Sequence, residues 1–290
     1  MAEYVLPTPT SDHLKHRNLG QLTYVERVAD SPGIHVFFHG LGLDATDYQE
    51  YLETHGTHGV AVSLAGYAPG RPAPLPPVPV ERHVSMVADL VARLSRDNPG
   101  KRITLVGFSL GADLALQLAE HWATAPGSAG LPLAGVLLLD PNVNQSTMTL
   151  SKIFAAADQH DPTAAFQSVV GLAGSLDGFR SLCTYALKVA SKDFAQVQRM
   201  ARDMLDYWEA TGYEQFGRRL ARLADLSDAV NVVLSADYET HLTGMREALR
   251  RNSANAPRVS FDVTSLDHFG LIEPDFLAPE LKALSDGRVA

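Results

Sequence analysis

Short apolar runs alternate along this chain with segments of helical periodicity, and this alternation constrains the fold more than any other feature of the sequence. Runs that suit buried strands occupy 34–38, 60–64, 103–106, 133–139, 230–234 and 259–263, and the alternating run 22–28 suits an antiparallel strand. Helical spacing of apolar residues predicts helices over 80–95, 110–122 and 273–284. Strands that alternate with helices predict an α/β fold with a mostly parallel twisted sheet flanked by helices.

The segment 142–226 interrupts this alternation. It contains no clear strand, and its large apolar residues recur with helical spacing. We therefore expect a helical insertion in a core formed by residues 1–141 and 227–290, and we interpret 142–226 as a lid over an active site. Most of its large apolar residues would form the insertion's own core, while some would line a substrate pocket. These residues are Phe154, Phe166, Phe179, Tyr185, Phe194, Met200, Met204, Trp208, Tyr213 and Phe216.

The pentapeptide Gly107-Phe108-Ser109-Leu110-Gly111 lies between the predicted strand 103–106 and the predicted helix 110–122. A G-x-S-x-G pattern at a strand–turn–helix junction is typical of a nucleophilic serine held on a tight, strained turn. The flanking glycines leave room for the backbones that crowd such a turn. The N-terminus of the helix favours the negative charge that develops during attack. The alternative is an ordinary turn in which Ser109 only caps the helix.

The order of motifs along the chain resembles that of the α/β-hydrolase superfamily, in its serine-nucleophile branch with a helical lid. His39-Gly40 follows an early strand, the Ser109 turn comes next, an acidic residue follows a late strand, and His268 lies near the C-terminus. The resemblance covers residues 22–284 and implies an α/β-hydrolase fold. It also implies that His268, between the last strand and the last helix, is the catalytic base, and that His39 is structural.

A carboxylate is needed to orient the base and to stabilise its cationic form. Asp237 follows the predicted strand 230–234 and fits the order serine, acid, histidine of this fold, so we expect it to be the acid. Asp140, at the end of the predicted strand 133–139, is the alternative, because some members of the family, including certain thioesterases, place the acid there. Asp140 could instead cap a turn before a proline. Glu239 is a third candidate.

The negatively charged oxygen of an acyl intermediate needs two fixed N–H donors. The N–H of Leu110, directly after the nucleophile, is expected to supply one. By the resemblance, the N–H of Leu41 in the loop after strand 34–38 supplies the other. Glycines at positions 40 and 42 would let this loop approach the substrate oxygen closely.

Composition argues against several other classes of function. The chain has 290 residues and a formal net charge of −9, which leaves no basic surplus for a nucleic-acid partner. The single cysteine, Cys183, has no partner for an intrachain disulfide, and no cysteine–histidine spacing resembles a zinc site. No apolar run reaches membrane-spanning length, and residues 1–10 lack the pattern of a secretion signal, so we expect a cytoplasmic protein. We expect neither a metal nor an organic cofactor.

These features predict a serine hydrolase that cleaves an ester, thioester or lactone through an acyl-Ser109 intermediate, with His268 moving the proton. The apolar insertion favours a small-molecule acyl or ring substrate that is largely apolar. A second hypothesis assigns the same pocket to a lyase, a cyclase or an acyl transferase, because fold does not decide the reaction. A third hypothesis is a non-catalytic binding protein, and the intact set of Ser109, His268 and Asp237 argues against it.

Overall fold

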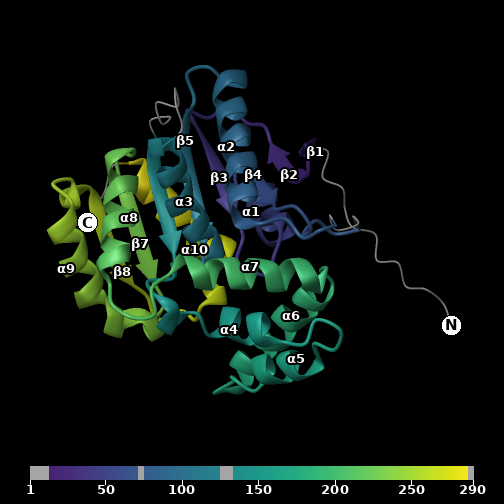
Figure 1. The fold of residues 1–290 in the computed structure, drawn as a ribbon. Coiled ribbons are helices and arrows are strands. Elements are labelled where there is room, and N and C mark those ends of the chain that lie inside the picture. Colours follow the sequence, from purple (N-terminus) through teal and green to yellow (C-terminus); the bar gives the residue numbers. More distant parts are fainter. Residues whose placement is uncertain (1–12, 71–74, 125–132, 287–290) are drawn as a thin grey trace.

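Eight strands form one sheet in the computed structural model, which describes residues 13–70, 75–124 and 133–286 (Figure 1). The strands are β1 (Leu14–Leu19), β2 (Leu22–Arg27), β3 (Gly33–Phe38), β4 (His58–Ser63), β5 (Arg102–Phe108), β6 (Leu133–Leu139), β7 (Val230–Leu234) and β8 (Val259–Val263). Their spatial order is β1-β2-β4-β3-β5-β6-β7-β8, with antiparallel pairs at β1/β2 and β2/β4 and parallel pairs elsewhere. This sheet confirms the predicted fold class. Residues 1–10, on which the expectation about a secretion signal rests, lie outside the described residues.

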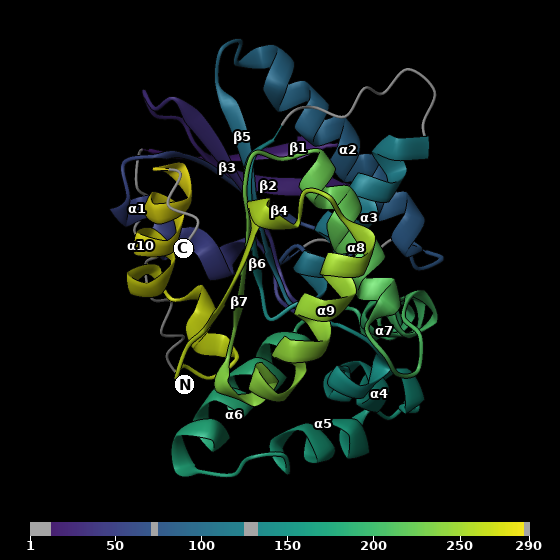
Figure 2. The ribbon, with the colours of Figure 1, turned by 90° about the vertical axis from the view of Figure 1, so that its left-hand side faces the viewer.

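Helices cover both faces of the sheet, which explains why the central strands are apolar almost throughout (Figure 2). One face carries α1 (Gln49–Thr54) and α10 (Pro274–Ser285). The other carries α2 (Val80–Asp97), α3 (Leu110–Thr124) and α8 (Glu214–Asp225), with α9 (Leu242–Asn252) packed on α8. Because parallel strands share one direction, the loops that follow β3, β5, β6 and β7 meet at the same edge of the sheet.

Four further helices lie beyond that edge of the sheet (Figures 1 and 2). They are α4 (Thr149–Ala156), α5 (Thr163–Val170), α6 (Leu176–Ala190) and α7 (Phe194–Tyr207), and they come between β6 and β7 in the chain. An aromatic cluster packs them together, with Phe154 about 6 Å from the rings of Phe166, Tyr185 and Phe194 (6.0, 6.3 and 6.0 Å between centroids). α8, the last helix within 142–226, packs instead against α3 and α9 beside the sheet.

The amide side chain of Gln196 attaches α7 to the core. Its Oε1 accepts a hydrogen bond of 2.7 Å from the N–H of Val78, and its Nε2 donates one of 2.9 Å to the carbonyl of Val78. Gln196 is fully buried, so losing either bond would leave a buried polar group unsatisfied. This pairing fixes α7 against the segment that precedes α2.

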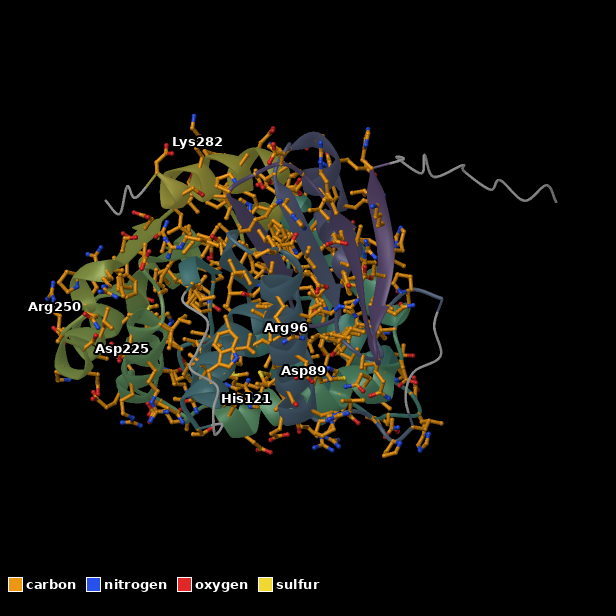
Figure 3. The ribbon with its side chains drawn as sticks, turned by 90° about the horizontal axis from the view of Figure 1, so that it is seen from above. Asp89, Arg96, His121, Asp225, Arg250 and Lys282 are labelled. Carbon is orange, nitrogen blue, oxygen red and sulfur yellow. The ribbon has the colours of Figure 1, made fainter. Side chains whose placement is uncertain are left out.

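Several charged side chains point outward from the layers of the molecule. Seen from above, Arg96, Asp225, Arg250 and Lys282 lie on exposed parts of α2, α8, α9 and α10 (Figure 3). None of the helices in the described part of the chain combines the length and the apolar character needed to cross a bilayer.

Candidate active site

Ser109 lies on a strained turn between β5 and α3. Its φ is +51°, in the left-handed region that side chains other than glycine rarely adopt, at a cost of roughly 1–3 kcal/mol. Two backbone hydrogen bonds hold the turn: Ser109 N–H donates to the carbonyl of Leu139 at 2.8 Å, and Ala112 N–H donates to the carbonyl of Ser109 at 2.9 Å. The predicted strand–turn–helix junction is therefore present, and it lifts the serine above the end of β5.

The two glycines of the motif let three backbones meet at this turn. A Cβ atom at Gly111 would lie 2.1 Å from the carbonyl oxygen of Phe38, at the end of β3. A Cβ atom at Gly107 would lie 2.5 Å from the carbonyl oxygen of Gly111. Both positions exclude any larger side chain, because the obstructing atoms belong to the backbone and cannot rotate away.

His268 lies between β8 and α10, in the turn that leads into the 3-10 helix η5 (Phe269–Ile272). The N–H of Gly270 donates to Oδ1 of Asp267 at 2.8 Å, which fixes this turn. The imidazole packs against the ring of Phe108, with 4.5 Å between centroids. Its Nδ1 lies 2.8 Å from Oδ2 of Asp140. A carboxylate can only accept here, so Nδ1 is the donor of this hydrogen bond.

Asp140 follows β6 and is fully buried. Its φ is +42°, and Ser109 and Asp140 are the two non-glycine residues of the described chain with a positive φ. The N–H of Ser235 donates to its Oδ1 at 2.7 Å, so both carboxylate oxygens have a partner. The unusual backbone angle turns this side chain toward His268.

The two candidate acids differ in their position relative to His268. Asp237 lies in the 3-10 helix η3 (Ala236–His241), past the end of β7, and is exposed. Among the described residues it makes no hydrogen bond with His268, whereas Asp140 makes one at 2.8 Å. This geometry favours the alternative acid, Asp140, over Asp237, which was preferred from the sequence. Glu239 lies on the same exposed turn as Asp237.

The loop after β3 carries the other predicted donor, Leu41. Leu41 and Leu110 both line the cavity that contains Ser109. Within the described part of the chain, neither of their N–H groups donates to another protein group. Gly42 has φ +79°, and the N–H of Leu43 donates to the carbonyl of Gly40 at 3.1 Å, which closes a tight turn. Both amides are therefore available to a bound oxygen atom.

His39 ties this loop to the neighbouring one. The side chain is 1% exposed, its Nδ1 lies 2.7 Å from the carbonyl of Gly40, and its Nε2 accepts from the N–H of Leu64 at 3.2 Å. Burial lowers the pKa of His39, so the ring is neutral at physiological pH. Because both ring nitrogens have a hydrogen-bond partner, His39 connects the loop after β3 to the backbone at Leu64.

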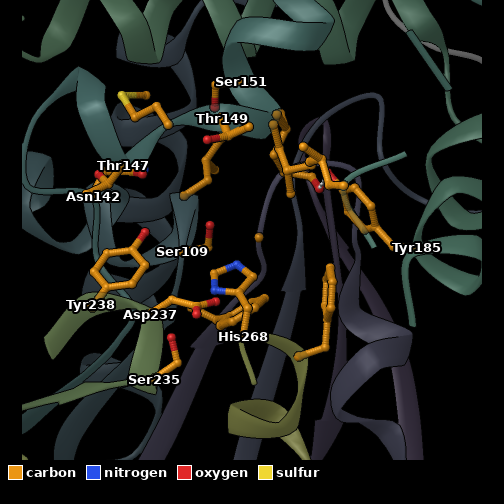
Figure 4. Close-up of a pocket in the computed structure, with 18 of the residues that line it drawn as sticks. Ser109, Asn142, Thr147, Thr149, Ser151, Tyr185, Ser235, Asp237, Tyr238 and His268 are labelled. Atoms are coloured by element: carbon orange, nitrogen blue, oxygen red, sulfur yellow. Dashed lines mark hydrogen bonds between the residues drawn. The ribbon is translucent and has the colours of Figure 1, made fainter. Parts of the chain in front are cut away.

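Ser109 and His268 face a cavity of about 390 Å³ between the sheet edge and the insertion (Figure 4). This volume suits a small molecule. Among the described residues no hydrogen bond joins the two side chains, and in unliganded enzymes such a contact often forms only when substrate binds.

The lining of the cavity is partly polar and partly apolar. In Figure 4, Asn142, Thr147, Asp237 and Tyr238 lie on one side of Ser109, and Tyr185 lies on the opposite side. The polar lining comprises Asn142, Ser146, Thr147, Thr149, Ser151, Ser235, Asp237, Tyr238 and His241, and the apolar lining comprises Leu41, Leu43, Phe108, Leu110, Met148, Leu150, Leu172, Leu182, Tyr185 and Phe269. Of the ten large residues singled out in the insertion, Tyr185 alone reaches this lining.

A buried carboxylate behind the cavity was not predicted. Asp113 lies one turn after Ser109 in α3 and is fully buried, and its Oδ2 accepts a hydrogen bond of 2.6 Å from Nδ2 of Asn142. Burial raises the pKa of Asp113 to about 7. Asn142 lines the cavity, so this pair connects the buried interior to the polar lining. A single aspartate within an apolar helix belongs to no motif, and the sequence therefore offered no signal for it.

No group of three or more His, Cys, Asp or Glu side chains in the described chain is placed to hold a metal ion. The candidate chemical groups of the site are Ser109, His268 and Asp140, together with two backbone N–H groups.

Comparisons with known proteins agree on the architecture. A model of the alpha/beta hydrolase family matches residues 36–280. No curated protein sequence matches the chain significantly. Among solved structures, the chain is similar to a thermophilic esterase from Thermogutta terrifontis with bound malate (14% identity, 96% of this chain and 99% of that chain, TM-score 0.66). It is also similar to MenH from S. aureus (15% identity, 93% and 100%, TM-score 0.64).

A third similar structure is that of AqDC, described for recognition and ring-cleavage of the Pseudomonas quinolone signal (17% identity, 94% of this chain and 99% of that chain, TM-score 0.69). At such identities the likeness concerns the fold.

Proposed function

The chain belongs to the alpha/beta hydrolase family, and we propose that it is a serine hydrolase that cleaves an ester, thioester or lactone. Ser109 is the nucleophile, His268 the base and Asp140 the acid of the proposed triad. One observation carries the proposal. The buried Asp140 carboxylate lies 2.8 Å from Nδ1 of His268, and His268 lines the same cavity as Ser109, which lies on a strained turn.

In the proposed mechanism each group has a role. Nε2 of His268 removes the hydroxyl proton as Ser109 attacks the acyl carbon, and Asp140 stabilises the imidazolium that forms. The N–H groups of Leu41 and Leu110 stabilise the negative oxygen of the tetrahedral intermediate. His268 then gives its proton to the leaving group and activates the water that releases the acyl group from Ser109.

The insertion would act as the lid of this site. We place the lid in α4–α7, because these helices lie beyond the strand ends and contribute lining residues such as Leu150 and Leu182. Residues 1–141 and 227–290 form the proposed core, and α8 belongs with them because it packs on α3 and α9.

The mixed polar and apolar lining of the cavity supports a small substrate of mixed polarity. The composition of the insertion alone favoured a largely apolar substrate. An apolar acyl chain or ring fits the side formed by Leu182, Tyr185 and Phe269. A hydroxylated or otherwise polar leaving group fits the side formed by Asn142, Asp237 and Tyr238. A matched series of esters with apolar and hydroxylated alcohol groups would measure this preference as a ratio of kcat/KM values.

The proposal is tested by active-site labelling with a fluorophosphonate probe, combined with turnover of p-nitrophenyl acetate and butyrate. Wild type should be labelled and should hydrolyse the esters, whereas Ser109→Ala should do neither and His268→Ala should lose nearly all of both. Ser146→Ala, which removes another hydroxyl from the same cavity, is the matched control and should keep both.

Two results would count against hydrolysis. A wild-type protein that is not labelled has no activated serine at position 109. A protein that is labelled but turns over no ester, thioester or lactone would favour the alternative, a lyase, cyclase or acyl transferase that uses the same pocket.

A further inference from the structure

One face of α6 is attached to the loop Gly40–Asp47, which carries one of the two proposed oxyanion donors. The face consists of Tyr185, Lys188 and Val189 in α6 and Lys192 just after it, spaced as neighbours on a helix surface. The Tyr185 hydroxyl donates to the carbonyl of Leu41 at 2.9 Å. The ammonium groups of Lys188 and Lys192 pair with Asp47 and Asp44 of the loop.

Part of this attachment is shielded from water. The side chains of Lys192 and Asp44 are only 4% and 5% exposed, and water therefore screens the pair little. Tyr185 is also buried, and burial raises the pKa of its hydroxyl, which keeps it protonated and able to donate.

Van der Waals contact adds to the polar contacts. A Cβ atom at Gly42 would lie 2.4 Å from Cγ2 of Val189, so Val189 of α6 packs directly against the backbone of the loop at Gly42. Gly42 directly follows Leu41, and its φ of +79° lets the chain turn sharply there. The helix and the loop therefore form one packed unit.

We infer that Tyr185 is a positioning residue for oxyanion stabilisation, because its hydroxyl holds the carbonyl of Leu41 and thereby fixes the backbone that presents the Leu41 N–H to the cavity. The inference rests on the proposed function. Donors that are oriented before the reaction stabilise the developing charge without a cost of reorganisation. The insertion would then supply part of the catalytic scaffold, and α6 would stay on the core during turnover.

The substitution Tyr185→Phe isolates the hydroxyl. It keeps the ring contacts with Phe269 and Phe154, at 5.1 and 6.3 Å between centroids, and removes the bond to Leu41. The matched control is Tyr207→Phe in α7, which removes a half-buried tyrosine hydroxyl that donates to Glu120 at 3.2 Å, away from the cavity.

We expect Tyr185→Phe to lower kcat for p-nitrophenyl butyrate by about 10- to 100-fold, somewhat less than the loss of a donor itself, with KM changed less than about threefold. Affinity for butaneboronic acid, whose adduct with serine mimics the tetrahedral intermediate, should fall by a similar factor. Affinity for butyrate, a ground-state ligand, should stay near the wild-type value. Tyr207→Phe should leave all three quantities within about twofold of wild type.

A Tyr185→Phe protein that keeps wild-type kcat and boronate affinity, or that loses boronate and butyrate affinity equally, overturns the positioning role. If wild type is neither labelled by fluorophosphonate nor active, the proposed function fails and this inference fails with it. Should Tyr185→Phe not fold, Lys188→Ala tests the same attachment at a half-exposed position. It should lower kcat and boronate affinity together by a smaller factor, and an unchanged kcat would contradict the inference.

Discussion

Backbone strain marks two of the three residues of the proposed triad. Ser109 and Asp140 each directly follow a strand, and each has a positive φ, +51° and +42°. Residues in this conformation cost free energy and persist where the surrounding structure enforces them, often at functional sites. Here the strain has an identifiable effect, because it turns one side chain into the cavity and the other toward His268.

Substitution of the two candidate acids separates their roles. Asp140→Asn should lower kcat by about 10³- to 10⁴-fold, because an amide that donates to Nδ1 would favour the wrong imidazole tautomer. Asp237→Asn should change kcat less than about threefold for a simple ester, since its carboxylate does not bond to His268. Steady-state kinetics with p-nitrophenyl acetate measure both, and circular dichroism checks that both variants fold. A large loss at Asp237 with a small one at Asp140 would restore the order expected from the sequence.

The sequence was sufficient to propose a nucleophile and a base, but it could not choose between two candidate acids. Gly107, Ser109 and Gly111 form a local motif, and a local motif determines local geometry. The choice between Asp140 and Asp237 depends on where two strand ends point in space. Only the structure shows that Asp140 adopts φ +42° and that Asp237 lies on an exposed turn.

At the scale of elements, prediction succeeded where one face or both faces of an element are buried. The strands β6, β7 and β8 have the predicted bounds, and α2 and α3 extend only two residues beyond theirs. β1 (Leu14–Leu19) was not predicted, because it lies at the sheet edge and its residues are mostly exposed, so no apolar alternation marks it. α9 was not predicted either, since its buried face consists of Met245, Ala248 and Leu249 alone.

Close packing of α3 on β3 predicts the effect of a single methyl group. Gly111→Ala should lower the free energy of unfolding by about 2 kcal/mol or more, because the new Cβ would lie 2.1 Å from the carbonyl oxygen of Phe38. Gly174→Ala is the matched control, at an exposed glycine with nothing within 4 Å of the added atom, and should change stability by less than about 0.5 kcal/mol. Urea unfolding followed by circular dichroism measures both, and equal stabilities would show that the two elements can separate at little cost.

At the scale of the whole molecule, buried histidines connect stability to pH. His83 in α2 is fully buried and His35 in β3 nearly so. Burial lowers the pKa of His83 to about 3 and that of His35 to about 4, each helped by a neighbouring histidine. The folded protein therefore keeps both rings neutral at pH values where the unfolded chain would protonate them. Asp113 acts in the opposite sense, because burial raises its pKa to about 7 and folding is then favoured at lower pH.

His83 should therefore make the protein less stable as pH falls from about 6.5 toward 3, because the unfolded state binds a proton that the folded state excludes. Between pH 7.5 and pH 5 this contribution amounts to about 2 kcal/mol, from 1.36 kcal/mol per pKa unit. His83→Gln should remove it, so that the loss of unfolding free energy between these two pH values is smaller than in wild type by that amount. The contribution of Asp113 is common to both proteins and cancels in this comparison. Urea unfolding at the two pH values measures the difference, with the exposed His16→Gln as the matched control. Equal pH dependence in wild type and His83→Gln would contradict the lowered pKa of His83 in the folded protein. It would mean that the folded protein also protonates this imidazole, or that water reaches it.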